Sequence, residues 1–162
     1  MKVLGFVTLF VLAVAIALVL AGQMGLLKGH MPAGLGVHNG RLKPPAETPN
    51  SVSSQAGLYP DNPQKNYAEI APFNFAGNGQ AAFNKLVGVV QRTHRCMVVD
   101  QKADYLYAQC STALLHFTDD IEFWLDAKDG VIHTRSASRL GQSDLGVNRA
   151  RVEKIRAQFL QN

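Results

Sequence analysis

Cysteine is scarce in this sequence, which has only two, Cys96 and Cys110, among its 162 residues. A chain of this length can bury an ordinary apolar core without a framework of disulfides or a structural metal. A zinc site is not expected, because these cysteines and the nearby His94 and His116 lack the spacing of known zinc motifs. The apolar fraction of 47% is that of a globular protein, so we expect one folded domain.

Charged residues are also few, at 17%, and the net charge of +4 is unevenly placed. Residues 135–162 contain six cations and two acids, so this stretch carries the whole excess. A basic end favours anionic partners such as phosphates, lipid headgroups or acidic protein faces, although a solvated helix face would have the same composition. No run of basic residues is interleaved with aromatics, and a nucleic-acid partner is therefore not expected.

Only one stretch is apolar for long enough to cross a bilayer. Residues 3–21 contain no charge and the uncharged stretch continues to Leu27, whereas a membrane-spanning helix needs about 20 residues. We therefore expect residues 1–27 to form a transmembrane anchor, with a signal sequence cleaved after Ala21 as the alternative. Lys2 and the N-terminal amine precede the run, and Lys28 and Arg41 follow it, so the charges alone leave the orientation open.

The rest of the chain divides into an arm and a globular part. Residues 28–57 are rich in Gly, Pro, Ser and Asn, which predicts a linker that runs into an extended arm. Residues 58–162 are expected to form the domain, with helices predicted over 78–92 and 144–158, capped by Asn78 and by Ser143 or Asp144. Apolar residues at helical spacing mark the buried faces: Phe83, Leu86, Val87 and Val90 in the first helix, and Val152, Ile155 and Phe159 in the second.

Two β-hairpins are predicted between the helices. The first covers residues 93–117 with its turn at 100–104, and the second covers residues 121–136 with a turn that ends in Asp-Gly. In the first hairpin Cys96 lies opposite Cys110, which leaves either a cross-strand disulfide or two buried free thiols. Together these elements predict an α+β fold, with an antiparallel sheet of about four strands and helices packed on one face.

The turn of the second hairpin also fixes which of its residues face each other. Glu122 lies opposite Arg135, and Trp124 lies opposite His133. The polar face of this hairpin is therefore expected to carry an acid–guanidinium pair.

Eight residues near the start of the second predicted helix form the candidate binding site. They are Arg135, Ser136, Ser138, Arg139, Ser143, Asp144, Asn148 and Arg149. Forked guanidinium donors, hydroxyls and the free N–H groups of a helix N-terminus suit the binding of an anion or of an acidic partner.

The same residues also have a structural explanation. Arg135 can form an ion pair with Glu122, and Arg139 can pair with Asp119 or Asp120. The acid at the start of the helix can serve as its cap. If the proline-rich arm docks on these polar groups, the cluster is a structural lock instead of a binding site.

Catalysis and metal binding have less support in the sequence. Ser136 or Ser138 could form a hydrolytic triad with His133 and an acid, but no Gly-x-Ser-x-Gly elbow is present. The acids of residues 119–122 are not expected to share a cation, because adjacent strand residues point to opposite faces. No metal and no cofactor is expected.

Residues 132–149, with the sequence IHTRSASRLGQSDLGVNR, resemble the signature of a protein family. Stretches at 48–55, 119–123 and 151–156 resemble it too, and the resemblance covers about residues 40–158. The family is domain of unknown function family 1499, which is found in bacterial envelopes and plastids and has no agreed activity. Its members often carry signal peptides or membrane anchors, which implies a domain on the periplasmic side.

Three positions depart from the family pattern. Relatives commonly have two cysteines in the proline-rich arm, where this chain has Pro45 and Ser51, so a disulfide that would staple the arm in relatives is absent here. Gln109 stands where relatives often have an acid, which implies one negative charge fewer near the arginines.

These observations lead to an expected function. We expect a non-catalytic accessory or binding protein, anchored by a single span in the bacterial inner membrane with its domain in the periplasm. Its partners would be other inner-membrane or envelope proteins, in a larger membrane complex, or anionic lipid headgroups. The alternative is a protein that binds a small anionic molecule, or a hydrolase-like enzyme, through the Ser/Arg cluster.

Overall fold

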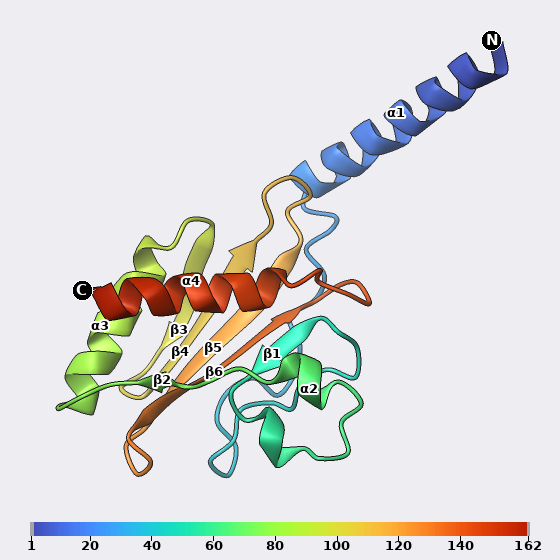
Figure 1. Cartoon of the computed structure of the whole chain (residues 1–162). Helices are drawn as coiled ribbons and strands as arrows, with labels where there is room; N and C mark the ends of the chain where they lie inside the picture. Colours follow the sequence, from blue (N-terminus) through green and yellow to red (C-terminus); the bar gives the residue numbers. More distant parts are fainter. Residues whose placement is uncertain (1, 162) are drawn as a thin grey trace.

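The computed structural model describes residues 2–161 and consists of a long N-terminal helix joined to an α+β domain (Figure 1). Helix α1 (Lys2–Gln23) points away from the domain, and its apolar side chains are exposed. It is long and apolar enough to cross a membrane, a property that an N-terminal signal sequence would share.

The domain is built on one antiparallel sheet, as the sequence predicted. Its long strands are β3 (Cys96–Gln101), β4 (Tyr105–Ser111), β5 (Thr118–Asp126) and β6 (Val131–Ser138), which form the two predicted hairpins. Two short strands, β1 (Ser51–Ser53) and β2 (Phe73–Asn74), are added at the outer edge of β6, which gives the order β1-β6-β5-β4-β3 with β2 beside β6. The α+β prediction is therefore confirmed, and the sheet has six strands where about four were expected.

Both predicted registers are confirmed. Cys96 pairs with Cys110 and the two form a disulfide, while Glu122 pairs with Arg135 in the second hairpin. The first hairpin is shorter than predicted, because β4 ends at Ser111 and residues 112–117 form a loop.

Two helices cover one face of the sheet. Helix α3 (Gly79–Arg92) begins after Asn78, whose side chain accepts a hydrogen bond from the Ala81 N–H. Helix α4 (Val147–Gln161) begins three residues later than predicted, because Leu145 and Gly146 have positive φ and cannot continue a helix. The buried side chains of α3 and α4 pack on those of the sheet in one apolar core that includes Phe83, Leu86, Phe123, Ile132, Ile155 and Phe159.

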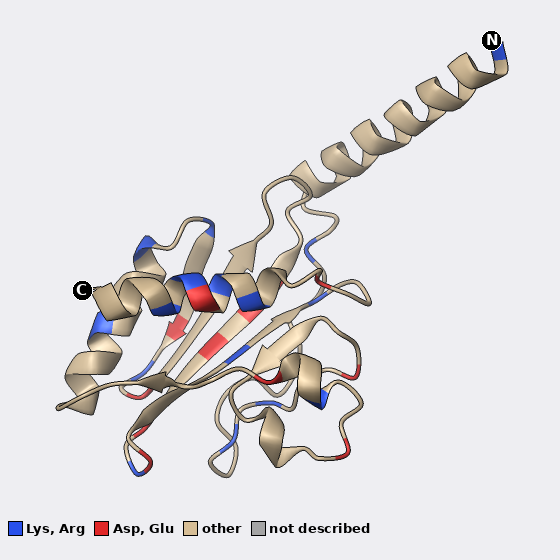
Figure 2. Ribbon diagram, in the orientation of Figure 1, with Lys and Arg blue, Asp and Glu red and all other residues tan. Residues whose placement is uncertain are grey.

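The other face of the sheet is covered by the arm that follows α1. Leu42 of the arm packs against Tyr105 and Tyr107 of β4, with Leu35 and Val37 beside it. The arm then continues into β1, the 3₁₀ helix η1 (Ala56–Leu58) and the short helix α2 (Lys65–Ala68). The sheet is therefore enclosed between a helical layer and an irregular layer. Figure 2 shows acids and bases on the strands themselves, with more bases along α4.

Candidate functional site

The eight candidate residues do not form one cluster, because strand alternation sends them to opposite faces of the sheet. Ser136 and Ser138 of β6 contact α4 on the helical face. Arg135, one residue away, lies on the face covered by the arm, and so does Arg139 just after the strand. Each group is part of a separate buried network.

The first network is centred on Glu122 and Arg135, whose side chains are 0% and 5% exposed. Glu122 Oε1 accepts hydrogen bonds from the Gly36 N–H at 2.7 Å and the Tyr105 hydroxyl at 2.8 Å, and Glu122 Oε2 faces Arg135 Nη1 at 3.6 Å. The Arg135 Nε donates to the Pro44 carbonyl of the arm. Burial raises the pKa of Glu122 and lowers the pKa of Arg135. Both pKa shifts arise because burial removes water from the side chain and disfavours its charged form.

The second pair on this face joins Arg139 to Asp120. The guanidinium donates to both carboxylate oxygens, with Nη2 2.7 Å from Oδ1, and this raises the pKa of Arg139. Tyr107 donates to the same carboxylate at 2.6 Å, and Gln109 donates to the Tyr107 hydroxyl. Bidentate geometry of this kind is specific and strong. Of the two acids considered from the sequence, it is Asp120 that binds Arg139.

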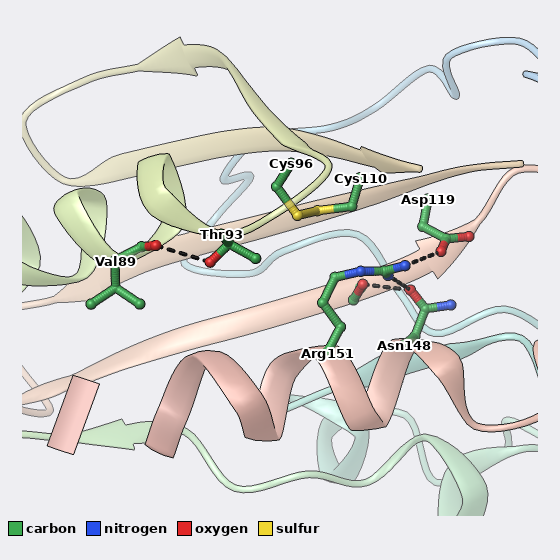
Figure 3. The surroundings of a disulfide bond; sticks show 8 residues. Val89, Thr93, Cys96, Cys110, Asp119, Asn148 and Arg151 are labelled. Carbon is green, nitrogen blue, oxygen red and sulfur yellow. Dashed lines mark hydrogen bonds and ion pairs between the residues drawn. A yellow bond between two sulfur atoms is a disulfide. The ribbon is translucent and has the colours of Figure 1, made fainter. Parts of the chain in front are cut away.

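On the helical face, Asn148 is the centre of the network. Its Oδ1 accepts from the Ser136 hydroxyl at 2.5 Å, and its Nδ2 donates to Ser138 Oγ at 3.0 Å and to the Asn50 carbonyl of the arm at 3.2 Å. Arg151 also donates to Asn148 Oδ1 and pairs with Asp119 at 2.5 Å (Figure 3). Because the residue is fully buried and its hydrogen bonds are used within the fold, this amide holds β6, α4 and the arm together.

Asp144 anchors the start of α4 in the same network. It accepts hydrogen bonds from the Tyr67 hydroxyl and from the backbone N–H groups of Gly146 and Asn148. Burial alone would raise the pKa of Asp144, but these hydrogen bonds lower it below its ordinary value. Ser143 differs from the other candidate residues, because it is exposed.

Most of the basic residues near the C-terminus bind other groups within the protein. Arg149 donates to the Tyr67 and Glu69 carbonyls, and Arg156 donates to those of Ala71 and Pro72. The two arginines therefore hold the end of α2 and the segment that leads from it to β2. Within residues 2–161, five arginines from 135 onward are thus bound to acids or carbonyls of the fold. The role of Arg151 was not predicted from the sequence, although its position three residues after Asn148 places it on the same helix face.

Ser136 and Ser138 lie on the opposite face of the sheet from the His133 ring. Ser136 donates to Asn148 on the helical face, whereas the His133 ring lies on the other face, stacked on Trp124 and in contact with the Ser54 hydroxyl. A hydrolytic triad of Ser136 with His133 is therefore not assembled. Burial lowers the pKa of His133, which favours a neutral ring.

Within the part of the chain that the structure describes, one group of side chains has ligand atoms close enough to hold a metal ion. Asp126, Asp129 and His133 at the end of the second hairpin offer atoms within 4.8 Å of one another. The hairpin turn explains this grouping, because Asp126 Oδ1 accepts from the N–H groups of Lys128 and Asp129. Asp–Gly turns place acids in this way without an ion.

Beside the candidate residues lies an apolar cleft of about 550 Å³. Its walls are the loop 112–117 on one side and residues 138–147 on the other. Its lining is mostly aliphatic and aromatic, and its polar residues are Thr112, Asp119, Ser138, Ser143 and Asp144. The sequence could not reveal this cleft, because one of its walls was predicted to be a strand.

The cleft lies at the end of the domain that joins α1. Gly22 of α1 is buried against the loop 112–117, where a Cβ would come within 2.4 Å of the Leu115 carbonyl oxygen. Farther along, Gly29 packs against Arg139 and Leu140 of the other wall. The apolar helix and the cleft are therefore joined by direct contacts.

Comparison with known protein families gives one match. The family described as "Protein of unknown function (DUF1499)" matches residues 41–159, which include every side chain of both polar networks and both walls of the cleft. No curated protein and no solved structure matches the chain. The match covers most of the sequence and confirms the family resemblance of residues 132–149. This chain therefore belongs to the DUF1499 family of proteins of unknown function.

Proposed function

We propose that this protein is a non-catalytic, membrane-anchored binding protein that recognises its partner at the end of the domain nearest the membrane. The observation that carries this proposal is the packing of Gly22 against Leu115, which fixes the apolar cleft at the point where the chain leaves α1. A domain held there meets membrane components far more often than a free one does.

A non-catalytic role is supported by how the polar residues are used. The guanidinium groups of Arg135 and Arg139 are bound to acids, and Ser136 is bound to Asn148. Nucleophiles and general bases need a substrate within hydrogen-bond reach, and these groups face the protein interior. The alternative function, an anion pocket or a hydrolase built from the Ser/Arg cluster, is therefore not favoured.

The periplasm is the compartment that we propose for the domain. The Cys96–Cys110 disulfide supports it, because such bonds persist in the bacterial periplasm and are rare in the cytosol. A C-terminal alkaline phosphatase fusion tests it, since this enzyme is active only after export. High phosphatase activity is expected, and an inactive fusion would contradict the periplasmic location.

The binding proposal is tested by purifying the full-length protein from membranes in mild detergent and identifying bound proteins by mass spectrometry. The variant Leu114→Glu/Leu145→Glu places charges at two exposed positions of the cleft rim. The matched control Leu58→Glu/Leu160→Glu changes exposed leucines elsewhere. We expect inner-membrane proteins that the native chain and the control retain and the rim variant loses. Identical sets from all three proteins would refute the proposal.

A further inference from the structure

We propose that the cleft between residues 112–117 and 138–147 takes an acyl chain of a phospholipid from the membrane that α1 spans. This assignment rests on the proposed function, in which α1 is a membrane anchor and the cleft lies at the membrane surface. It adds the chemical class of the ligand.

The lining of the cleft selects for hydrocarbon. Leu115, Phe117, Leu140 and Val147 supply apolar walls. The buried acids at the cleft are already bound, Asp119 to Arg151 and Asp144 to Tyr67 and the start of α4. Asp119 is paired with a cation and the Asp144 carboxylate is held by hydrogen bonds within the fold, so neither offers a free partner to a bound ion. An apolar chain would displace only water. The volume of about 550 Å³ lies within the range of small-molecule sites, about 300–1,000 Å³.

The rim of the cleft is apolar as well as exposed. Leu145 is 92% exposed and Leu114 is 63% exposed, and Leu140 and Val147 also face solvent. Leu145 has φ 51°, a left-handed conformation that a leucine rarely adopts. Strained backbone conformations of this kind cluster at ligand-binding and switch sites. Contiguous exposed apolar side chains of this kind mark surfaces that bind membranes or apolar ligands.

The position of the rim identifies a lipid as the occupant. Gly22 contacts Leu115 and Gly29 contacts Leu140, so the two walls flank the exit of the chain from α1. Met24 and Leu26, which follow α1, are exposed too and extend the apolar surface from the helix to the rim. Because α1 leaves the domain at this end (Figure 1), a bilayer around α1 would lie next to the two walls of the cleft.

The first experiment measures phospholipid that remains bound to the full-length protein after purification in mild detergent. The variant Ala113→Trp fills the cleft from an exposed loop position. The matched control Ala76→Trp fills a different pocket of about 480 Å³ beside Phe75 and Phe159. We expect about one phospholipid per chain for the native protein and the control, and loss of that lipid in Ala113→Trp. Equal retention by both variants, or no lipid on the native protein, would overturn the assignment.

The second experiment locates the acyl chain. Trp124 is the only tryptophan of the chain and lies in β5 beside Gly40, away from the cleft. In phosphatidylcholine vesicles with brominated acyl chains, the variant Phe117→Trp/Trp124→Phe should show strong fluorescence quenching and the native protein little. Equal, weak quenching of the two would contradict the proposal. If lipid binding fails while inner-membrane proteins still copurify, the acyl-chain assignment is wrong and the proposed function stands.

Discussion

At the scale of single residues, the pairing of Arg135 with Glu122 could be predicted from the sequence, but the burial of the pair could not. The Asp-Gly turn fixes the hairpin register, so their pairing follows from the sequence. Their complete burial does not, because it depends on Pro44 and Gly36 of an arm that lies far away in the chain. The pair predicted on the polar face of the hairpin is enclosed by the fold.

This burial makes the pair sensitive to the loss of one partner. We expect Arg135→Met to reduce the free energy of unfolding by about 3–5 kcal/mol, because it leaves Glu122 buried without its counter-charge. Adding Glu122→Gln should restore part of the loss, since glutamine keeps an oxygen for Gly36 and Tyr105 but carries no charge. Urea unfolding of the three proteins measures this difference.

The matched control for this prediction is Lys102→Met. Lys102 pairs with Asp100 at 3.4 Å on the surface, and such pairs contribute about 0–1 kcal/mol. If Arg135→Met lowered the free energy of unfolding no more than Lys102→Met does, the ion pair would not stabilise the fold as a buried pair should. The same conclusion would follow if the double variant were as unstable as Arg135→Met.

His133 should make stability depend on pH. Burial lowers its pKa below the ordinary value of about 6.5, although Asp126 and Asp129 favour the charged ring. Between the two pKa values the unfolded chain binds more protons than the folded one, so this contribution is present above pH 6.5 and is lost as pH falls. The free energy of unfolding should therefore fall less between pH 7.5 and 5.5 in His133→Gln than in the native protein. Equal falls would contradict the prediction.

At the scale of elements, the long strands and helices were predictable because their signals are local. Alternation, helical spacing and the Asn78 cap all lie within the element concerned. Strands β1 and β2 were not predicted, because each has two or three residues and exists only through pairing with β6. The late start of α4 was missed for a related reason, since Leu145 gives no sign of its positive φ.

Strand β3 depends on its disulfide more than the other long strands do. It pairs only with β4 and forms one edge of the sheet, and the Cys96–Cys110 bond joins the two strands beside the end of α3 (Figure 3). We expect Cys96→Ala/Cys110→Ala to lower the free energy of unfolding by about 2–4 kcal/mol. Hydrogen exchange should become faster mainly in β3, because edge strands open locally.

Chemical reduction provides the control for this prediction. Dithiothreitol should destabilise the native protein to a similar extent and leave the double alanine variant unchanged. Uniformly faster exchange across the whole sheet would show that the bond supports the entire fold and not its edge.

At the scale of the whole molecule, the candidate site was only partly predictable. The candidate residues come from one short stretch of sequence, but strand alternation divides them between two networks on opposite faces of the sheet. The cleft could not be predicted, since its walls are two loops brought together by the sheet. The arm takes part in both networks, because Pro44 accepts from Arg135 and Asn50 accepts from Asn148.

The arm should therefore be needed for folding of the domain. It supplies β1, the buried Leu42 and the Gly36 N–H that binds Glu122. A chain of residues 29–162 should unfold cooperatively in urea, whereas a chain of residues 58–162 should lack a cooperative transition and near-ultraviolet circular dichroism. Without the arm, the ion pair of Glu122 and the tyrosines of β4 would face water on an open sheet. A cooperative transition in the shorter chain would mean that the helical face alone holds the sheet, and that the arm is a covering added to a domain already stable.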